Sequence, residues 1–105
     1  MKEYEFFPDE VRDALPPLYV QEKAKDPTVY VKFFTPWSYW TWYITEGEQR
    51  GDDFLMFGYI KGMANEWGYF SLNELSSVKG PMGLAIERDI HFTPKPKSQV
   101  SDIKG

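Results

Sequence analysis

Trp37-Ser38-Tyr39-Trp40-Thr41-Trp42-Tyr43 is the stretch of this 105-residue chain that decides its fold. It lies in the most aromatic part of the sequence, since 14 of the 19 aromatic residues fall between Val29 and Phe70. From Tyr39 to Glu46 the residues alternate in the period of a β-strand that buries one face. The tryptophans of this strand share a face with Ile44, and we expect that face to line the core. Aromatic and β-branched residues suit a pleated surface, so the stretch predicts a small aromatic-rich sheet.

Further segments complete the predicted sheet. Val29 to Phe34 is a β-branched and aromatic run, and Phe54 to Lys61 follows a polar turn with two glycines, Gly47 to Asp53. Glu66 to Phe70 is the fourth predicted strand. Leu84 to Phe92 begins apolar and then alternates, which predicts a last strand or an extended segment.

Two short helices accompany this sheet. Pro8 to Leu15 combines an early proline, acidic residues and apolar residues spaced by three and four, and Pro16-Pro17 ends it. Ser71 and Glu74 have the spacing of a capping box, which predicts a helix from about Leu72 to Lys79.

The fold class that follows is α+β. We predict a single globular domain over residues 1–92, with a mainly antiparallel sheet of four to five strands and two short helices. Residues 93–105 contain two prolines and few apolar side chains, and we expect them to form a loosely ordered C-terminal tail.

Composition excludes several classes of function. The net charge is -4, and the residues before Thr93 carry 9 basic and 15 acidic side chains, a net charge of -6. General nucleic-acid binders neutralise phosphates with Lys and Arg, so this balance argues against such a binder. No apolar stretch approaches the roughly 20 residues of a membrane span. With no secretory signal visible and no cysteine for a disulfide framework, we expect a cytoplasmic location.

Two surfaces are candidates for binding a protein partner. If Trp40, Trp42 and Phe57 line the core, the rings left on the outer face are Trp37, Tyr39, Tyr43 and Tyr59. Exposed aromatic residues are frequent in binding hot spots. The alternative is that the helices cover that face. The second candidate is an acidic hairpin formed by Glu46, Glu48, Asp52 and Asp53. It is either an ordinary solvated turn or a patch that meets the basic groove of a nucleic-acid enzyme.

The densest cluster of ionisable groups is Glu87, Arg88, Asp89 and His91. On a strand, the two carboxylates and the imidazole would share one face, as metal binding or proton transfer requires. Charged residues that protect an edge strand are the more ordinary explanation, and no second His or Cys completes a usual transition-metal set.

Glu46 and Glu66 lie next to aromatic residues, as the paired carboxylates of glycoside-cleaving enzymes do, but a chain with one small sheet has little room for a sugar cleft. We therefore expect no catalytic residue, no metal and no cofactor, and no enzymatic activity.

Short motifs over most of the chain resemble one known family. They are Leu15-Pro16-Pro17-Leu18-Tyr19, Lys32-Phe33-Phe34-Thr35-Pro36, Trp40-Thr41-Trp42-Tyr43, Phe57-Gly58, Gly68-Tyr69-Phe70-Ser71-Leu72 with Glu74-Leu75, and Ile86-Glu87-Arg88-Asp89 followed by Phe92. Together they resemble domain of unknown function 2958, which occurs in short proteins of bacteria, plasmids, phages and integrative elements. The chain departs from that pattern at Phe7, which stands in place of the usual Thr cap, and in its longer N-terminus. The resemblance implies a mobile-element context and transfers no catalytic residue.

These observations lead to two functional hypotheses. The first is a non-enzymatic protein-interaction module of a mobile genetic element. It would bind a protein partner through the aromatic face and the acidic hairpin, and the partner would be a host nuclease or defence complex that it counters. The second is a nucleic-acid-associated accessory protein of DNA transfer or maintenance, in which Lys32, Lys61 and the tail lysines approach phosphates while aromatic rings stack on bases.

Overall fold

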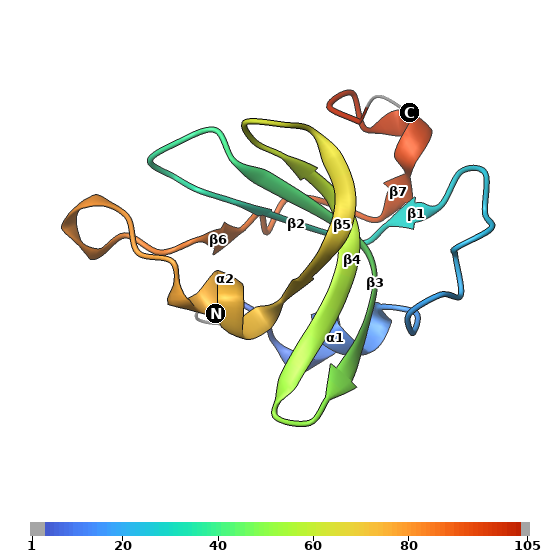
Figure 1. The fold of residues 1–105 in the computed structure, drawn as a ribbon, viewed down its shortest axis with the longest axis horizontal. Coiled ribbons are helices and arrows are strands. Elements are labelled where there is room, and N and C mark those ends of the chain that lie inside the picture. Colours follow the sequence, from blue (N-terminus) through green and yellow to red (C-terminus); the bar gives the residue numbers. More distant parts are fainter. Residues whose placement is uncertain (1–3, 104–105) are drawn as a thin grey trace.

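A five-stranded antiparallel sheet forms the centre of the computed structural model, which describes residues 4–103 (Figure 1). Its strands lie in the order β5-β4-β3-β2-β6. Their bounds are β2 (Val31–Phe34), β3 (Thr41–Arg50), β4 (Asp53–Lys61), β5 (Glu66–Ser71) and β6 (Glu87–Arg88). A second, two-stranded sheet pairs β1 (Thr28–Val29) with β7 (Lys95–Pro96). With two short helices, α1 (Asp9–Ala14) and α2 (Leu72–Ser77), this arrangement confirms the predicted α+β domain.

The β3–β4 hairpin is longer than the sequence suggests. The polar residues expected to form a wide turn continue the ladder as far as the Arg50–Asp53 pair, so only Gly51 and Asp52 form the turn. Gly51 has a φ of +60°, a conformation that glycine adopts without steric cost and that two-residue hairpin turns require.

One face of the sheet, here called the first face, carries the larger core. Phe33, Trp42, Ile44, Met56 and Phe70 are buried there. Leu15, just after α1, and Leu75, in α2, belong to the same cluster, so the helical segments cover this face. The side-chain hydroxyl of Ser71 accepts the backbone N–H of Glu74, and the Glu74 carboxylate accepts the N–H of Ser71, which confirms the capping box. No helix within residues 4–103 combines the length and apolar character of a membrane span.

The opposite face, here called the second face, is covered by the C-terminal segment. Val100 is buried there against Val29, Tyr43 and Tyr59, and Phe92 and Ile103 pack against the same cluster. The short 3-10 helices are Pro81–Gly83 and Lys97–Gln99, and the second of these leads directly into Val100. The structure therefore differs from the loose tail expected after Thr93. The few apolar side chains of residues 93–103 cover Tyr43 and Tyr59, which would otherwise be exposed to water. The backbone of β7 pairs with that of β1.

Candidate binding cleft

The four rings expected on an outer face do not form a surface patch. Tyr43 and Tyr59 are each only 3% exposed, because the C-terminal segment covers them, so the expectation is wrong for these two residues. Trp37 is half-buried and packs against Gly80, where an added Cβ would lie 2.3 Å from the indole ring. Tyr39 alone of the four is largely exposed, at 60%.

The expected acidic hairpin is mostly an internal acceptor of hydrogen bonds. Glu46 is 3% exposed and accepts the backbone N–H groups of Tyr19 and Gln21. Glu48 accepts the N–H of Leu18, and Asp53 accepts that of Asn73. These carboxylates point toward neighbouring loops and not toward solvent, because the backbone N–H groups of those loops need acceptors. Only Asp52, in the turn, remains as an exposed acid of the predicted set.

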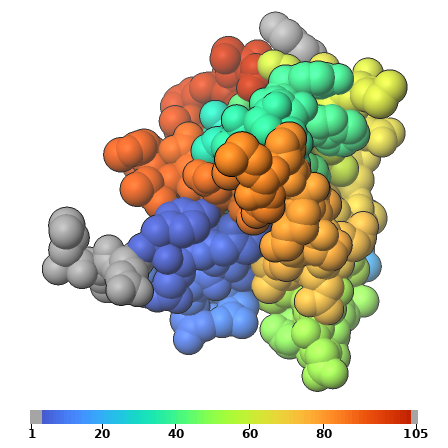
Figure 2. All heavy atoms as spheres, turned by 90° about the vertical axis from the view of Figure 1, so that its left-hand side faces the viewer, coloured from blue at the N-terminus to red at the C-terminus, as the bar shows by residue number. Residues whose placement is uncertain are grey.

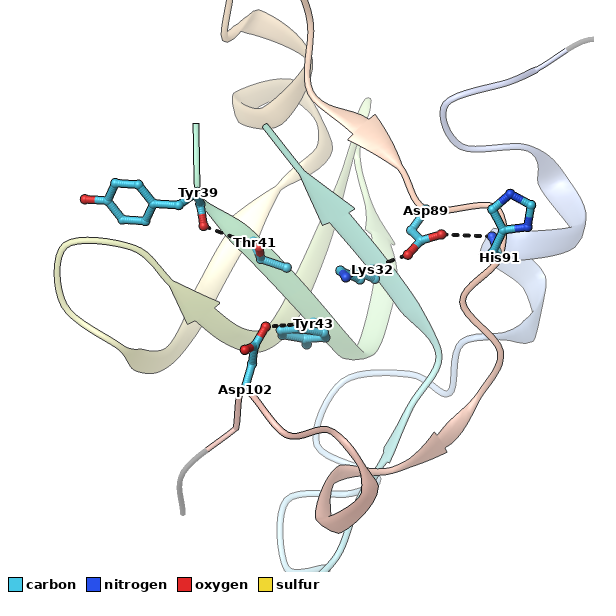
Figure 3. A network of polar contacts seen from close by, with 7 residues as sticks. All are labelled: Lys32, Tyr39, Thr41, Tyr43, Asp89, His91 and Asp102. Atoms are coloured by element: carbon cyan, nitrogen blue, oxygen red, sulfur yellow. Dashed lines mark hydrogen bonds and ion pairs between the residues drawn. The ribbon is translucent and has the colours of Figure 1, made fainter. Parts of the chain in front are cut away.

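The Glu87–His91 cluster holds two segments together. The Arg88 guanidinium donates to the backbone carbonyls of Glu5 and Phe6, and the N-terminal segment lies beside the segment that follows α2 (Figure 2). Asp89 forms an ion pair with Lys32 at 3.7 Å and accepts the backbone N–H of His91 (Figure 3). Arg88 therefore holds the N-terminal segment against β6. Within residues 4–103, no group of three or more His, Asp or Glu side chains is placed to hold a metal ion.

A cleft of about 320 Å³ lies on the second face, between the sheet and the loop that follows α1. Phe57 of β4 and Trp67 and Tyr69 of β5 form its aromatic wall, and Tyr19 of the loop lies opposite. The ring centroids of Phe57 and Tyr69 are 4.8 Å apart, and those of Phe57 and Trp67 are 5.9 Å apart. Tyr19 and Tyr69 are each 52% exposed, with centroids 6.5 Å apart, so the cleft is open at their side.

A β-bulge turns Glu46 into this cleft. The register between β3 and β4 shifts between Ile44 and Glu46, so that Ile44 pairs with Gly58 while Glu46 pairs with Phe57. Glu46 thereby points to the second face, where regular alternation would have placed it with Ile44 on the first. The side-chain amide of Gln21 donates to the carbonyl of the bulged Thr45 at 2.9 Å, which satisfies a backbone group that the bulge removes from the ladder.

The loop over the cleft is held in a strained conformation. Tyr19 has a φ of +75°, which is unfavourable for a bulky residue and costs roughly 1–3 kcal/mol. Its backbone N–H donates to Glu46 at 3.1 Å, and this bond fixes the position from which the Tyr19 ring faces Tyr69. Strain that persists beside a cleft is typical of functional sites.

The electrostatic character of the cleft favours a cation. Glu22 and Glu46 line the cleft, and Lys97 is the only basic residue among the lining residues within 4–103. The pKa of Tyr69 is raised, first because desolvation disfavours the phenolate, and then because that phenolate would be repelled by an ionised Tyr19 and by the carboxylates of Glu22 and Glu46. Lys97 already places its ammonium 5.7 Å from the centre of the Trp67 ring, which shows that this wall can hold a cation.

A polar network keeps the C-terminal wall of the cleft in place. The Tyr43 hydroxyl donates to Asp102 (Figure 3), and Lys61 bonds the same carboxylate at 2.8 Å. Burial and then the bond to Asp102 raise the pKa of Tyr43, so the phenol stays protonated. The bonds from Lys61 and then Tyr43 lower the pKa of Asp102. This network fixes the segment that carries Lys97.

The sequence predicted Glu46 as a binding residue but not the four rings of the cleft, Tyr19, Phe57, Trp67 and Tyr69. Phe57, expected in the core with Trp40 and Trp42, lies instead on the second face opposite Glu46. Trp67 and Tyr69 alternate on a predicted strand, which was a usable signal. Nothing local placed Tyr19 opposite them, because the approach depends on the bulge and on the hydrogen bonds of Glu46.

Comparison with known proteins agrees with the resemblance found in the sequence. A family model described as "Protein of unknown function (DUF2958)" matches residues 9–102. Searches of curated proteins and of solved structures found no match. Because the family model spans most of the chain, this protein belongs to the family described as "Protein of unknown function (DUF2958)".

Proposed function

We propose that the protein is a non-enzymatic interaction module that receives a lysine or arginine side chain of a protein partner in the aromatic cleft. The observation that carries the proposal is the combination of four rings with the carboxylates of Glu22 and Glu46 in one cleft. A cation close to aromatic faces is attracted by about 0.5–2 kcal/mol, and a nearby carboxylate adds to that attraction.

The cleft is suited to binding in size and in rigidity. A volume of about 320 Å³ accommodates a long side chain and falls at the lower end of ordinary ligand pockets. Tyrosine and tryptophan combine large contact area with few rotatable bonds, which is why they are common in hot spots. The backbone N–H groups of Tyr19 and Gln21 donate to Glu46 and fix the loop before a partner arrives, so less entropy is lost on binding.

The chemistry of the cleft also suits the partner expected from the family resemblance. A nucleic-acid enzyme lines its substrate groove with Lys and Arg, and such side chains are the cations that this cleft would accept. A host defence nuclease therefore remains our candidate partner, with a mobile genetic element as the context and the cytoplasm as the location. Cell fractionation and co-purification of a nuclease with the tagged chain would test this part, and recovery of the chain in the membrane fraction would contradict it.

Within residues 4–103, the nucleic-acid alternative gains little support from the lysines that it requires; Lys104, another tail lysine, lies outside the described residues. Lys32 pairs with Asp89, and Lys61 pairs with Asp102. Lys95 lies 4.8 Å from the ring centre of Phe92, and Lys97 lies against Trp67. Tyr43 and Tyr59 are buried, so these two rings are not available to stack on bases. A phosphate-binding surface would need these cations free to contact a backbone.

Selection from a display library of random 12-residue peptides tests the proposal. We expect the selected peptides to be rich in Lys or Arg and to lose roughly tenfold in affinity for Tyr69→Ala, since the ring contributes a cation contact and buried area. Tyr39→Ala is the matched control, because it removes an equally exposed tyrosine away from the cleft. Selected peptides without basic residues, or an equal loss with both variants, would contradict the proposal.

A further inference from the structure

We propose that the partner binds as an extended strand that adds to the outer edge of β5 and sends alternate Lys or Arg side chains into the cleft. This inference rests on the proposed function and adds the form in which the partner presents its cations.

β5 is the longer terminal strand of the five-stranded sheet. Within the described part of the chain, the sheet order places no strand beyond β5, which has six residues. At the other end, β6 has only two residues, and its Arg88 bonds Tyr4, Glu5 and Phe6. The outer side of a terminal antiparallel strand presents backbone donors and acceptors to an incoming strand.

β5 also lacks the features that usually prevent edge pairing. Natural edges are blunted by lysine, proline, bulges or very short strands. The strand Glu66-Trp67-Gly68-Tyr69-Phe70-Ser71 contains neither lysine nor proline, and its register with β4 is regular throughout. The edge therefore carries no lysine, proline or bulge, and its one charged side chain is Glu66 at the start of the strand.

Gly68, in the middle of β5, is not explained by packing within the chain. An added Cβ there would approach only the Cδ1 atom of Ile60, at an ordinary 3.8 Å. At Gly58, by contrast, an added Cβ would lie 1.9 Å from the carbonyl oxygen of Tyr43, so glycine is required. Gly68 thus leaves the middle of β5 without a side chain on the first face, between Trp67 and Tyr69 on the second.

The edge and the cleft are geometrically continuous. Trp67 and Tyr69 are alternate residues of β5 on the second face and also form the cleft wall. Side chains directly opposite on a neighbouring strand have Cβ atoms roughly 4.5–5.5 Å apart. Alternate residues of an added strand would thus stand beside these two rings. Their cations would be directed toward Glu22, the exposed carboxylate of the cleft, whose charge acts on Tyr69. Glu46 lies two strands further in, on β3, and Glu66 points to the first face.

Backbone methylation of the tightest selected peptide tests the inference without altering the protein. Two versions are compared, each carrying N-methyl groups on one alternate set of backbone nitrogens. Strand addition uses only one set, so we expect one version to lose at least about fivefold in affinity and the other to change by less than about twofold. Bound unmethylated peptide should also slow hydrogen exchange at one alternate set of β5 amides, either those of Gly68 and Phe70 or those of Trp67 and Tyr69.

The remaining outcomes separate this inference from the proposed function. Peptides that fail to bind Tyr69→Ala but tolerate both methylation patterns, with no slowing of amide exchange along β5, would overturn strand addition and leave the cleft proposal standing. Failure to select any basic peptide would overturn both. A dimer of the free chain that already protects the β5 amides, seen by sedimentation and exchange, would make a second copy the occupant and overturn the proposed partner.

Discussion

Removal of the Glu46 carboxylate should cost more stability than removal of any exposed acid in this chain. Glu46 accepts the N–H groups of Tyr19 and Gln21 and is almost wholly buried. A hydrogen bond to a charged group contributes about 1.5–3 kcal/mol, so the two bonds together are worth roughly 3–6 kcal/mol. The freed N–H groups lie in a partly exposed loop and would regain some water, which favours the lower end.

We therefore expect Glu46→Ala to lower the free energy of unfolding by about 3 kcal/mol, which corresponds to a fall in Tm of at least about 12 °C for a domain of this size. Glu46→Gln keeps one acceptor oxygen and should lose about half as much. Urea unfolding gives the energies, and hydrogen exchange at the Tyr19 and Gln21 amides reports the loop directly.

Glu66→Ala is the matched control, because Glu66 is an exposed acid of β5 and should change stability by less than about 0.5 kcal/mol. The reasoning would be refuted if Glu46→Ala cost no more than Glu66→Ala. It would also be refuted if exchange at Tyr19 and Gln21 did not accelerate in the Ala variant, since the loop would then be held by other contacts.

Three further predictions concern other parts of the fold. Gly58→Ala should cost about 3 kcal/mol in urea unfolding, because the new Cβ would lie 1.9 Å from a backbone oxygen of β3. Gly68→Ala, whose Cβ would make one ordinary contact at 3.8 Å, should be near neutral, and equal losses would contradict the packing argument. Hydrogen bonds from Lys61 and Tyr43 lower the pKa of Asp102 in the folded state. The contribution of Asp102 to the free energy of unfolding is therefore complete above the unfolded pKa of about 3.9 and is lost as the pH falls through the lower folded value. Urea midpoints measured from pH 6 to 2.5 should fall less steeply for Asp102→Asn than for the parent protein, and parallel curves would count against this linkage. Ser71→Ala should lower the free energy of unfolding by about 1 kcal/mol through loss of the α2 cap, and an unchanged urea midpoint would show that the cap contributes nothing.

The sheet and the start of α2 were predictable because their signals are local. Alternation from Tyr39 to Glu46 identified β3 and correctly placed Trp42 and Ile44 in the core. The spacing of Ser71 and Glu74 fixed the start of the second helix. Each of these signals involves residues only a few positions apart, where propensity and side-chain capping act directly.

The cleft was not predictable because it depends on contacts between distant residues. The alternation up to Glu46 gives no sign of the bulge that turns this carboxylate to the second face. Two-residue strands such as β1 and β7 carry no periodicity, so the docking of the C-terminal segment left no pattern. Burial of Tyr43 follows from that docking, and its alternating position alone could not distinguish a covered ring from an exposed one.

Docking of the C-terminal segment also has a consequence for the order of folding. The Tyr43–Asp102 bond joins residues 59 positions apart, whereas β3 and β4 are joined by a two-residue turn. Closing the longer loop costs more chain entropy, so we expect it to follow the folding transition state. Substitutions at Val100 should then accelerate unfolding and leave the refolding rate nearly unchanged in stopped-flow experiments. The first face would form as the kinetic nucleus, and the two buried tyrosines would be among the last side chains to leave water.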